Sequence, residues 1–148
     1  MQFIDLAKQQ LRIKAQLDCR IQAVLAHGQY IMGPEVYELE EKLANYVGVK
    51  HCITNSSGTD ALLLVEMALG IGPGDEVITT PLTWVSSVET TQVLGAKTVF
   101  VDIDRRTYNL NANLLEAAIT EKTKAIMPVS LYGQPSDMTA INAIAKKY

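Results

Sequence analysis

The sequence predicts an α/β protein in which a mostly parallel β-sheet carries helices on both faces. Two amphipathic segments come first, and after residue 50 short β-branched segments alternate with helical segments as far as residue 148. Alternation of this kind is typical of parallel sheets, whose strands are joined by crossover helices. Residues 98–101 and 124–129 are mostly apolar, as is typical of strands that are buried on both faces.

The first third of the sequence predicts two helices separated by a short connector. Residues 9–26 place apolar side chains on one face, and Gly28 follows where helices commonly stop. A second helix is expected from Pro34, since proline tolerates the first helical position, to Gly48. The apolar positions are Leu17, Ile21, Val24 and Leu25 in the first segment and Val36, Leu39, Leu43 and Val47 in the second.

From residue 51 onward the pattern predicts strands and helices in strict alternation. The strands are expected at residues 51–54, 76–80, 98–101 and 124–129. The helices are expected at residues 61–69, 85–94, 112–119 with Asn111 as the cap, and 138–147. The whole of residues 1–148 is thus expected to be part of one domain, with two leading helices at 9–47 and alternating elements at 51–148.

Composition excludes several classes of protein. A net charge of −3 argues against a binder of nucleic acid, which neutralises phosphates with a basic surface. No apolar run approaches the ~18 residues that indicate a membrane span, and no secretory signal opens the sequence. Cys19 and Cys52 lie far apart without any metal-binding spacing, so we expect no metal site, reduced thiols and a cytoplasmic location.

The clearest candidate site follows the first expected strand of the alternating part. Ser57, Gly58 and Thr59 directly open a helix, where free backbone N–H groups and the helix dipole favour an anion such as phosphate. Ser57 followed three residues later by Asp60 also resembles an ordinary capping box. These residues alone therefore fit two interpretations, a phosphate-binding site and an ordinary helix cap.

Three further segments follow expected strands and have both functional and structural interpretations. Trp84, the single tryptophan, is suited to stack on a flat ligand ring, or else packs half-buried against the sheet. Asp102 and Asp104 would suit a metal or ribose hydroxyls, but such a pair is more often a solvated turn. Tyr132 leaves a strand at the ligand face, or simply belongs to a turn.

One glycine-rich segment has no place in a nucleotide site. Residues 70–75 lie between a helix and a strand, whereas a dinucleotide fingerprint must follow a strand and open a helix. The segment is therefore predicted to be a helix stop and a turn. Walker A, GxSxG and HExxH motifs are absent from the sequence, so the kinase, esterase and zinc-protease interpretations lose their main support.

Three segments together resemble one family, the DegT/DnrJ/EryC1/StrS sugar aminotransferases, which use pyridoxal phosphate (PLP). The segments are residues 28–36 (GQYIMGPEV), residues 57–62 (SGTDAL) and residues 72–78 (GPGDEVI), the last joined by Thr83 and Trp84. The resemblance covers the chain from Phe3 to Tyr148. It implies the N-terminal part of the large domain of a type I, aspartate aminotransferase-like fold, mostly parallel, without the small C-terminal domain.

The resemblance also implies roles for particular residues. The phosphate of PLP would lie on the helix N-terminus at Ser57, Gly58 and Thr59, with Trp84 stacked on the pyridine ring where the family more often has Phe or Tyr. Glu89 is a further cofactor candidate. Candidates for contact with the nucleotide-sugar are Tyr30, Ile31, Met32, Gly33, Tyr132 and Gln134.

The implied activity is transfer of an amino group, from L-glutamate as donor, to a keto group of a nucleotide-linked sugar. Residues 3–6, Gln9, Gln10 and residues 107–110 look most similar to members that act at C3 of a UDP-linked 2-acetamido-3-oxo-glucuronate. Such products feed bacterial surface polysaccharide, as in O-antigen biosynthesis of lipopolysaccharide. Family members are cytoplasmic homodimers with active sites at the subunit interface.

The chain departs from the family in length. The Schiff-base lysine and the aspartate that pairs with the pyridine nitrogen lie beyond residue 148 in family members, so this chain holds no catalytic residue and is expected to be inactive by itself. Two alternatives remain. One is a PLP-dependent sugar dehydratase, in which a histidine replaces the lysine, and the other is a non-catalytic ligand-binding or regulatory module with the same fold.

Overall fold

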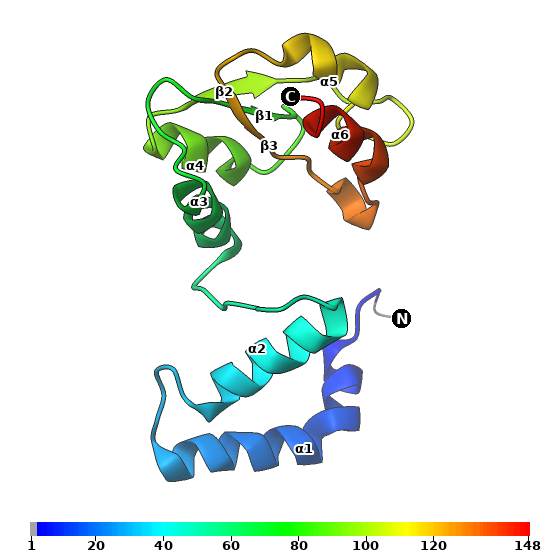
Figure 1. Cartoon of the computed structure of the whole chain (residues 1–148). Helices are drawn as coiled ribbons and strands as arrows, with labels where there is room; N and C mark the ends of the chain where they lie inside the picture. Colours follow the sequence, from blue (N-terminus) through cyan, green and yellow to red (C-terminus); the bar gives the residue numbers. More distant parts are fainter. Residues whose placement is uncertain (1–2) are drawn as a thin grey trace. The chain divides into compact units, whose positions relative to one another are not determined.

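The structure is a computed structural model that describes residues 3–148 (Figure 1). Contacts within the chain divide it into two compact units, the first ending at Thr54 and the second beginning at Asn55. The expectation that all 148 residues belong to one large domain stays a prediction. Within the described residues, no helix is both long enough and apolar enough to span a membrane.

The first unit consists of two helices, α1 (Leu6–His27) and α2 (Pro34–Val47). Asp5 caps α1 by accepting from the N–H of Lys8, so the helix begins three residues before the predicted start. Gly28 and Gly48 end the helices in the left-handed conformation, as predicted, at φ 68° and 77°.

The predicted apolar face of α1 finds no core within this unit. None of the described residues of α1 is buried, and Leu17 and Ile21 remain 40% and 47% exposed. Two polar pairs connect α1 to α2: Arg20 donates to Glu38, and His27 lies 3.2 Å from Glu35. The helical periodicity is confirmed by α1, whereas the apolar face that it predicts stays largely exposed among the described residues.

The strand predicted at residues 51–54 is wrong, because this segment is extended but pairs with no strand among the described residues. The Thr54 N–H donates instead to Oε1 of Glu40 on α2, over 2.8 Å, and its hydroxyl donates to the same oxygen. These bonds hold the pKa of Glu40 below its ordinary value, the backbone N–H contributing most. Ile53 is left 79% exposed, since no neighbouring strand covers it.

The second unit is built on a three-stranded parallel sheet of order β2-β1-β3 (Figure 1). The strands are β1 (Glu76–Thr79), β2 (Lys97–Phe100) and β3 (Thr123–Ile126). Ile78 pairs with Val99 on one side and Ile126 on the other, which sets the register. The parallel sheet predicted from the alternation is confirmed, although each strand is four residues long.

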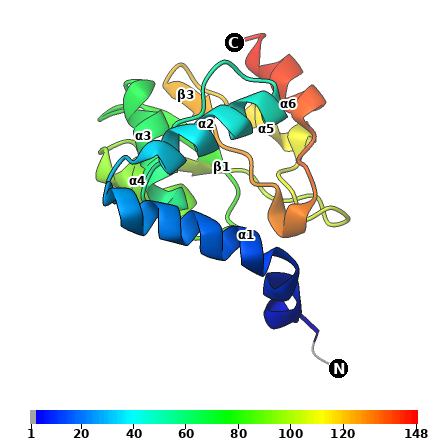
Figure 2. The same ribbon diagram turned by 90° about the horizontal axis from the view of Figure 1, so that it is seen from below.

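Helices cover both faces of this sheet, as predicted. They are α3 (Gly58–Ala68), α4 (Ser86–Val93), α5 (Ala112–Ala118) and α6 (Met138–Ala145), with a single 3₁₀ turn, η1 (Leu131–Gly133). Because successive strand residues point to opposite faces, Val77 packs with Ile71 and Ala96, whereas Ile78 packs with Leu115 and Ile141 of α5 and α6. The second view separates α3 and α4 from α5 and α6 (Figure 2).

Two segments that were interpreted as turns have that structure. Gly70 and Gly74 adopt φ 69° and 98° between α3 and β1, and the N–H of Gly72 donates to Asp75. Asp104 accepts from the N–H groups of Arg106 and Thr107, which hold its pKa below the ordinary value. The described residues contain no group of three or more His, Cys, Asp or Glu side chains arranged to hold a metal.

Candidate functional site

The N-terminus of α3 combines a helix cap with two unused donors. The Ser57 hydroxyl accepts from the N–H of Asp60 over 3.1 Å, and the Ser57 carbonyl accepts from Ala61. The N–H groups of Gly58 and Thr59 precede the intrahelical bonds and find no acceptor in the described part of the chain. Capping and anion binding are therefore compatible here, because the cap occupies only the third N–H of the helix.

The predicted capping box forms only in part. Asp60 does not return to the backbone of Ser57; its carboxylate accepts from the hydroxyl of Ser56. The space in front of Gly58 is open, since a Cβ placed there would meet no atom within 4 Å. An anion could approach the two free N–H groups through this space, and the partial positive charge of the helix end would attract it.

The helices α3 and α4 lie side by side and bring two of the predicted residues to one hollow. This hollow, of about 370 Å³, includes Thr59 from α3 and Glu89 from α4, and it is otherwise mainly apolar. The Thr59 hydroxyl lies 2.7 Å from the hydroxyl of Ser86, the first residue of α4. Thr59 is therefore anchored to the neighbouring helix, although 27 residues separate the two in sequence.

Trp84 lies in the connection from β1 to α4, beyond the carboxyl end of the strand. Its carbonyl accepts from the N–H of Ser87 over 3.1 Å, which fixes the turn into α4. The side chain is 77% exposed, so the interpretation of a half-buried aromatic packed against the sheet is wrong in this structure. An indole that buries little of its own surface is available to cover a ligand.

Tyr132 and Gln134 lie in and just after η1, which follows β3. Tyr132 has a left-handed backbone, at φ 56°, and its side chain is 87% exposed. Asn109 secures this turn: it accepts from the N–H of Leu131 and donates to the carbonyls of Gln134 and Pro135. A strained backbone held by a buried amide is the kind of local feature that accompanies functional loops.

The remaining candidates, Tyr30 to Gly33, belong to the first unit. Tyr30 and Ile31 are 68% and 89% exposed, and Met32 adopts a left-handed backbone at φ 50°. Gly33 has a structural reason to be glycine, because a Cβ there would lie 2.3 Å from the carbonyl oxygen of Gln29. This connector is thus a tight turn into α2 with three exposed side chains, those of Tyr30, Ile31 and Met32.

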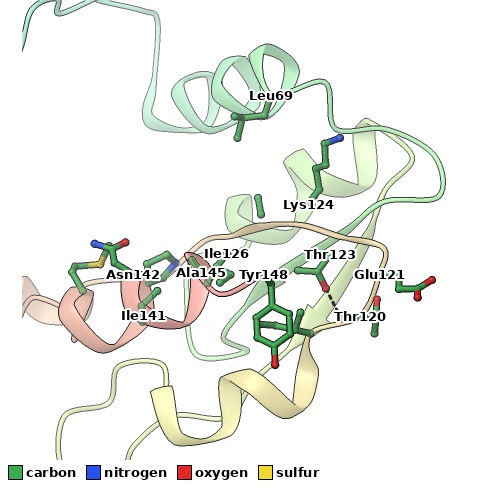
Figure 3. A pocket seen from close by; sticks show the side chains of 14 residues that line it. Leu69, Thr120, Glu121, Thr123, Lys124, Ile126, Ile141, Asn142, Ala145 and Tyr148 are labelled. Carbon is green, nitrogen blue, oxygen red and sulfur yellow. Dashed lines mark hydrogen bonds between the residues drawn. The ribbon is translucent and has the colours of Figure 1, made fainter.

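A larger hollow of the second unit lies elsewhere. It has a volume of about 840 Å³ and is lined by residues of β3 and α6, including Ile126 and Ile141, and by Tyr148 (Figure 3). None of the predicted site residues borders it. The predicted residues Thr59 and Glu89 border the smaller hollow between α3 and α4 instead.

Sequence reasoning missed three residues that organise this region: Ser86, Asn109 and Glu66. Ser86 and Glu66 are 6% and 2% exposed, and each bonds to a residue of the neighbouring helix. Asn109 appeared only as part of a motif, without a role. The available signal was Glu66 itself, the one charged residue within the apolar run of residues 61–69.

Comparison with known proteins identifies the family. The model of the DegT/DnrJ/EryC1/StrS aminotransferase family matches residues 12–148, and the chain belongs to this family. A UDP-2-acetamido-2-deoxy-3-oxo-D-glucuronate aminotransferase of Pseudomonas aeruginosa is 65% identical over all 148 residues, which span 41% of that relative. A protein named pleiotropic regulatory protein from Geobacillus stearothermophilus is 45% identical over 98% of the chain and 39% of its own length.

Solved structures agree with this assignment. A DegT DnrJ EryC1 StrS aminotransferase from Brucella abortus superposes with a TM-score of 0.94 at 45% identity, over 99% of this chain and 41% of that one. The PMP form of the sugar aminotransferase Spr1654 from Streptococcus pneumoniae superposes with a TM-score of 0.82 at 38% identity, over 86% of this chain and 32% of that one. The α/β fold of PLP aminotransferases is therefore confirmed.

Proposed function

We propose that the gene product containing this chain transfers an amino group from an amino acid, L-glutamate, to the C3 keto group of a UDP-linked 2-acetamido-3-oxo-glucuronate. One observation carries the proposal. The relative from Pseudomonas aeruginosa that is named for this substrate shares 65% identity over the whole chain. Relatives with 44% and 42% identity are also named as transaminases of nucleotide-linked amino sugars.

The residues at the α3 N-terminus fit the phosphate of PLP. They supply two free backbone N–H groups, at Gly58 and Thr59, and the hydroxyls of Ser57 and Thr59, with open space in front of them. Neutral donors at a helix end suit a phosphate dianion. The family match and a neighbour solved in its PMP form supply independent support for this cofactor.

When bound, PLP supplies an electron-withdrawing ring that stabilises negative charge on the carbon of the amino donor. The chain described here would contribute the binding and orientation of that ring. Gly58 and Thr59 would hold the phosphate, and Trp84 would cover a ring face and exclude water from it. Glu89, in the first turn of α4 and on the same hollow as Thr59, would border the cofactor.

Each of the two units has an exposed segment that we propose, separately, as a candidate for contact with the nucleotide-sugar. Tyr30, Ile31, Met32 and Gly33 form one, and Tyr132 with Gln134 forms the other. Their exposed aromatic rings and strained backbone suit contact with a flat nucleoside base and with sugar hydroxyls. We further propose that the gene product is a cytoplasmic homodimer in surface-polysaccharide biosynthesis, as its family resemblance implies.

The test uses the purified full gene product. We expect it to convert the 3-oxo sugar nucleotide to the 3-amino product with L-glutamate, releasing 2-oxoglutarate, as followed by mass spectrometry and a coupled assay. A dTDP-linked 3-oxo sugar serves as the matched control substrate and should react more slowly. Residues 1–148 expressed alone should show no turnover.

Other outcomes would favour the alternatives. A product that has lost water without gaining nitrogen would identify a dehydratase. Tight binding of ligand with no conversion, under conditions where a known transaminase is active, would favour the regulatory module, which the name of the Geobacillus stearothermophilus relative also suggests. Light scattering of the gene product would test the dimer.

A further inference from the structure

Ser86 is a buried hydroxyl that the motifs did not single out. It is the first residue of α4 and is 6% exposed, whereas its partner Thr59 lies at the open end of α3. The two hydroxyl oxygens are 2.7 Å apart, and either can be the donor. Thr59 is a residue that the proposed function assigns to phosphate binding, so its hydrogen bond has a bearing on that role.

The number of protons available restricts how this pair can work. A hydroxyl donates one hydrogen bond and accepts up to two. If Thr59 donates to an anion, it has no proton left for Ser86, and Ser86 must become the donor. The Ser86 hydroxyl is free to do so, because its only hydrogen bond among the described residues is the one to Thr59. The nearby Thr90 hydroxyl bonds to the backbone carbonyl of Ser86 and leaves the Ser86 side chain unaffected.

We propose that Ser86 is a positioning residue that aims the Thr59 hydroxyl at the cofactor phosphate. In the bound state the chain of donors runs from Ser86 to Thr59 to a phosphate oxygen. Each bond polarises the next, so that the buried serine strengthens the donor that touches the anion. Ser86 also limits rotation of the Thr59 side chain before the anion arrives, which reduces the entropy lost on binding.

This inference rests on the proposed function, because it assumes that phosphate binds at α3. Its test therefore compares PLP with pyridoxal, which has the same ring but a hydroxymethyl group in place of the phosphate ester, and wild type and variants are measured with both. The dissociation constants of both are measured by equilibrium dialysis with the apo-form of the full gene product. Their ratio isolates the phosphate contribution, and the affinity for pyridoxal reports whether each variant keeps an intact ring pocket.

Ser86→Ala is expected to weaken PLP binding about five-fold, the effect of one neutral hydrogen bond, and to leave pyridoxal binding unchanged. Ser87→Ala is the matched control: Ser87 is also 6% exposed, but its hydroxyl lies 3.0 Å from that of Thr83, whereas Thr59 pairs with Ser86. The control should change neither constant. The ³¹P resonance of bound PLP should shift in Ser86→Ala and not in Ser87→Ala.

A double variant distinguishes whether Ser86 acts through Thr59 or contacts the phosphate directly. Thr59→Val should weaken PLP binding roughly ten-fold or more, because it removes a donor to a charged group. Adding Ser86→Ala to Thr59→Val should then have no further effect, since Ser86 acts only through Thr59.

Three results would overturn the inference. Ser86→Ala could weaken the binding of PLP and of pyridoxal equally, or it could give the same ratio of the two dissociation constants as Ser87→Ala. The effects of Ser86→Ala and Thr59→Val on PLP binding could also be fully additive. A wild-type protein that binds both ligands equally would overturn the phosphate site itself, and the inference with it. A wild-type preference for PLP that Ser86→Ala leaves intact would overturn the inference alone and leave the proposed function standing.

Discussion

Thr91 on α4 donates a hydrogen bond of 2.8 Å to Oε1 of Glu66 on α3, and both side chains are almost fully buried. The second oxygen, Oε2 of Glu66, has no partner among the described residues. This bond and the one from Thr59 to Ser86 join the same two helices, near the two ends of the contact. Two pairs of polar side chains therefore connect α3 to α4.

The Glu66 pair should behave differently when one partner or both are changed. Glu66→Ala should lower the free energy of unfolding by about 2–4 kcal/mol, because it leaves a cavity and removes the partner of Thr91. The double change Glu66→Leu with Thr91→Val should be neutral or stabilising, since it also removes the unpaired buried oxygen. Urea denaturation measures both. A double variant less stable than Glu66→Ala would contradict this account.

Asn109 should be essential to the turn that carries Tyr132. Its amide makes three hydrogen bonds to the segment from Leu131 to Pro135, and the residue is 3% exposed. Asn109→Ala should lower the free energy of unfolding by about 2–3 kcal/mol, because these backbone groups lose their partner. Hydrogen exchange should rise at residues 131–135. Asn113→Ala, at an exposed position of α5, is the control and should change stability by less than ~0.5 kcal/mol.

Glu76 should make the stability of the second unit depend on pH in the acid range. Its carboxylate accepts from the hydroxyl of Thr120 and from Lys97, and these contacts, the first contributing most, lower its pKa below the ordinary value of 4.5. A lowered pKa means that the stabilisation is complete above pH ~4.5 and is lost as the pH falls through the folded-state pKa. Stability measured from pH 7 to pH 3 should fall less steeply in Glu76→Gln. Equal slopes would show that Glu76 carries none of the effect.

Gly33 should not accept a larger side chain. A methyl group would lie 2.3 Å from the carbonyl oxygen of Gln29, so Gly33→Ala must shift the backbone of the turn before α2. We expect a loss of about 1–3 kcal/mol in unfolding free energy, as in other overpacked sites. Gly72→Ala is the matched change, because its nearest contact lies at 4.0 Å and its φ is not left-handed. If both variants were equally stable, the clash would not be the reason for glycine.

Trp84 should matter for the cofactor and not for folding. Trp84→Ala should leave the free energy of unfolding within ~0.5 kcal/mol of wild type, because the ring is 77% exposed. It should weaken PLP binding roughly three- to ten-fold, the effect of one aromatic stacking contact, whereas Trp84→Phe should keep most of the affinity. Leu82→Ala in the same connection is the control. Unchanged PLP binding in Trp84→Ala would show that the indole ring does not contact the cofactor.

Local sequence signals accounted for most elements but not for their ends or partners. Gly28, Pro34 and Gly48 predicted the boundaries of α1 and α2 because each acts on its own backbone. The strand expected at 51–54 failed because a strand requires a neighbour, and Thr54 bonds to Glu40 instead. The structural interpretation of Trp84, a half-buried ring packed against the sheet, was wrong because the exposure of a side chain depends on which residues pack around it. Local sequence does not specify those neighbours.

The sequence by itself determined the α/β class, the parallel sheet and the family, because periodicity, turn residues and contiguous motifs act over a few residues. Only the tertiary structure decided that Ser86 lies against Thr59, that Glu66 is buried beside Thr91 and that Asn109 secures the turn of Tyr132. These pairs are separated by more than 20 residues in the chain. They meet because helices and sheet pack together, and a buried hydroxyl or amide then has no partner except the one that this packing supplies.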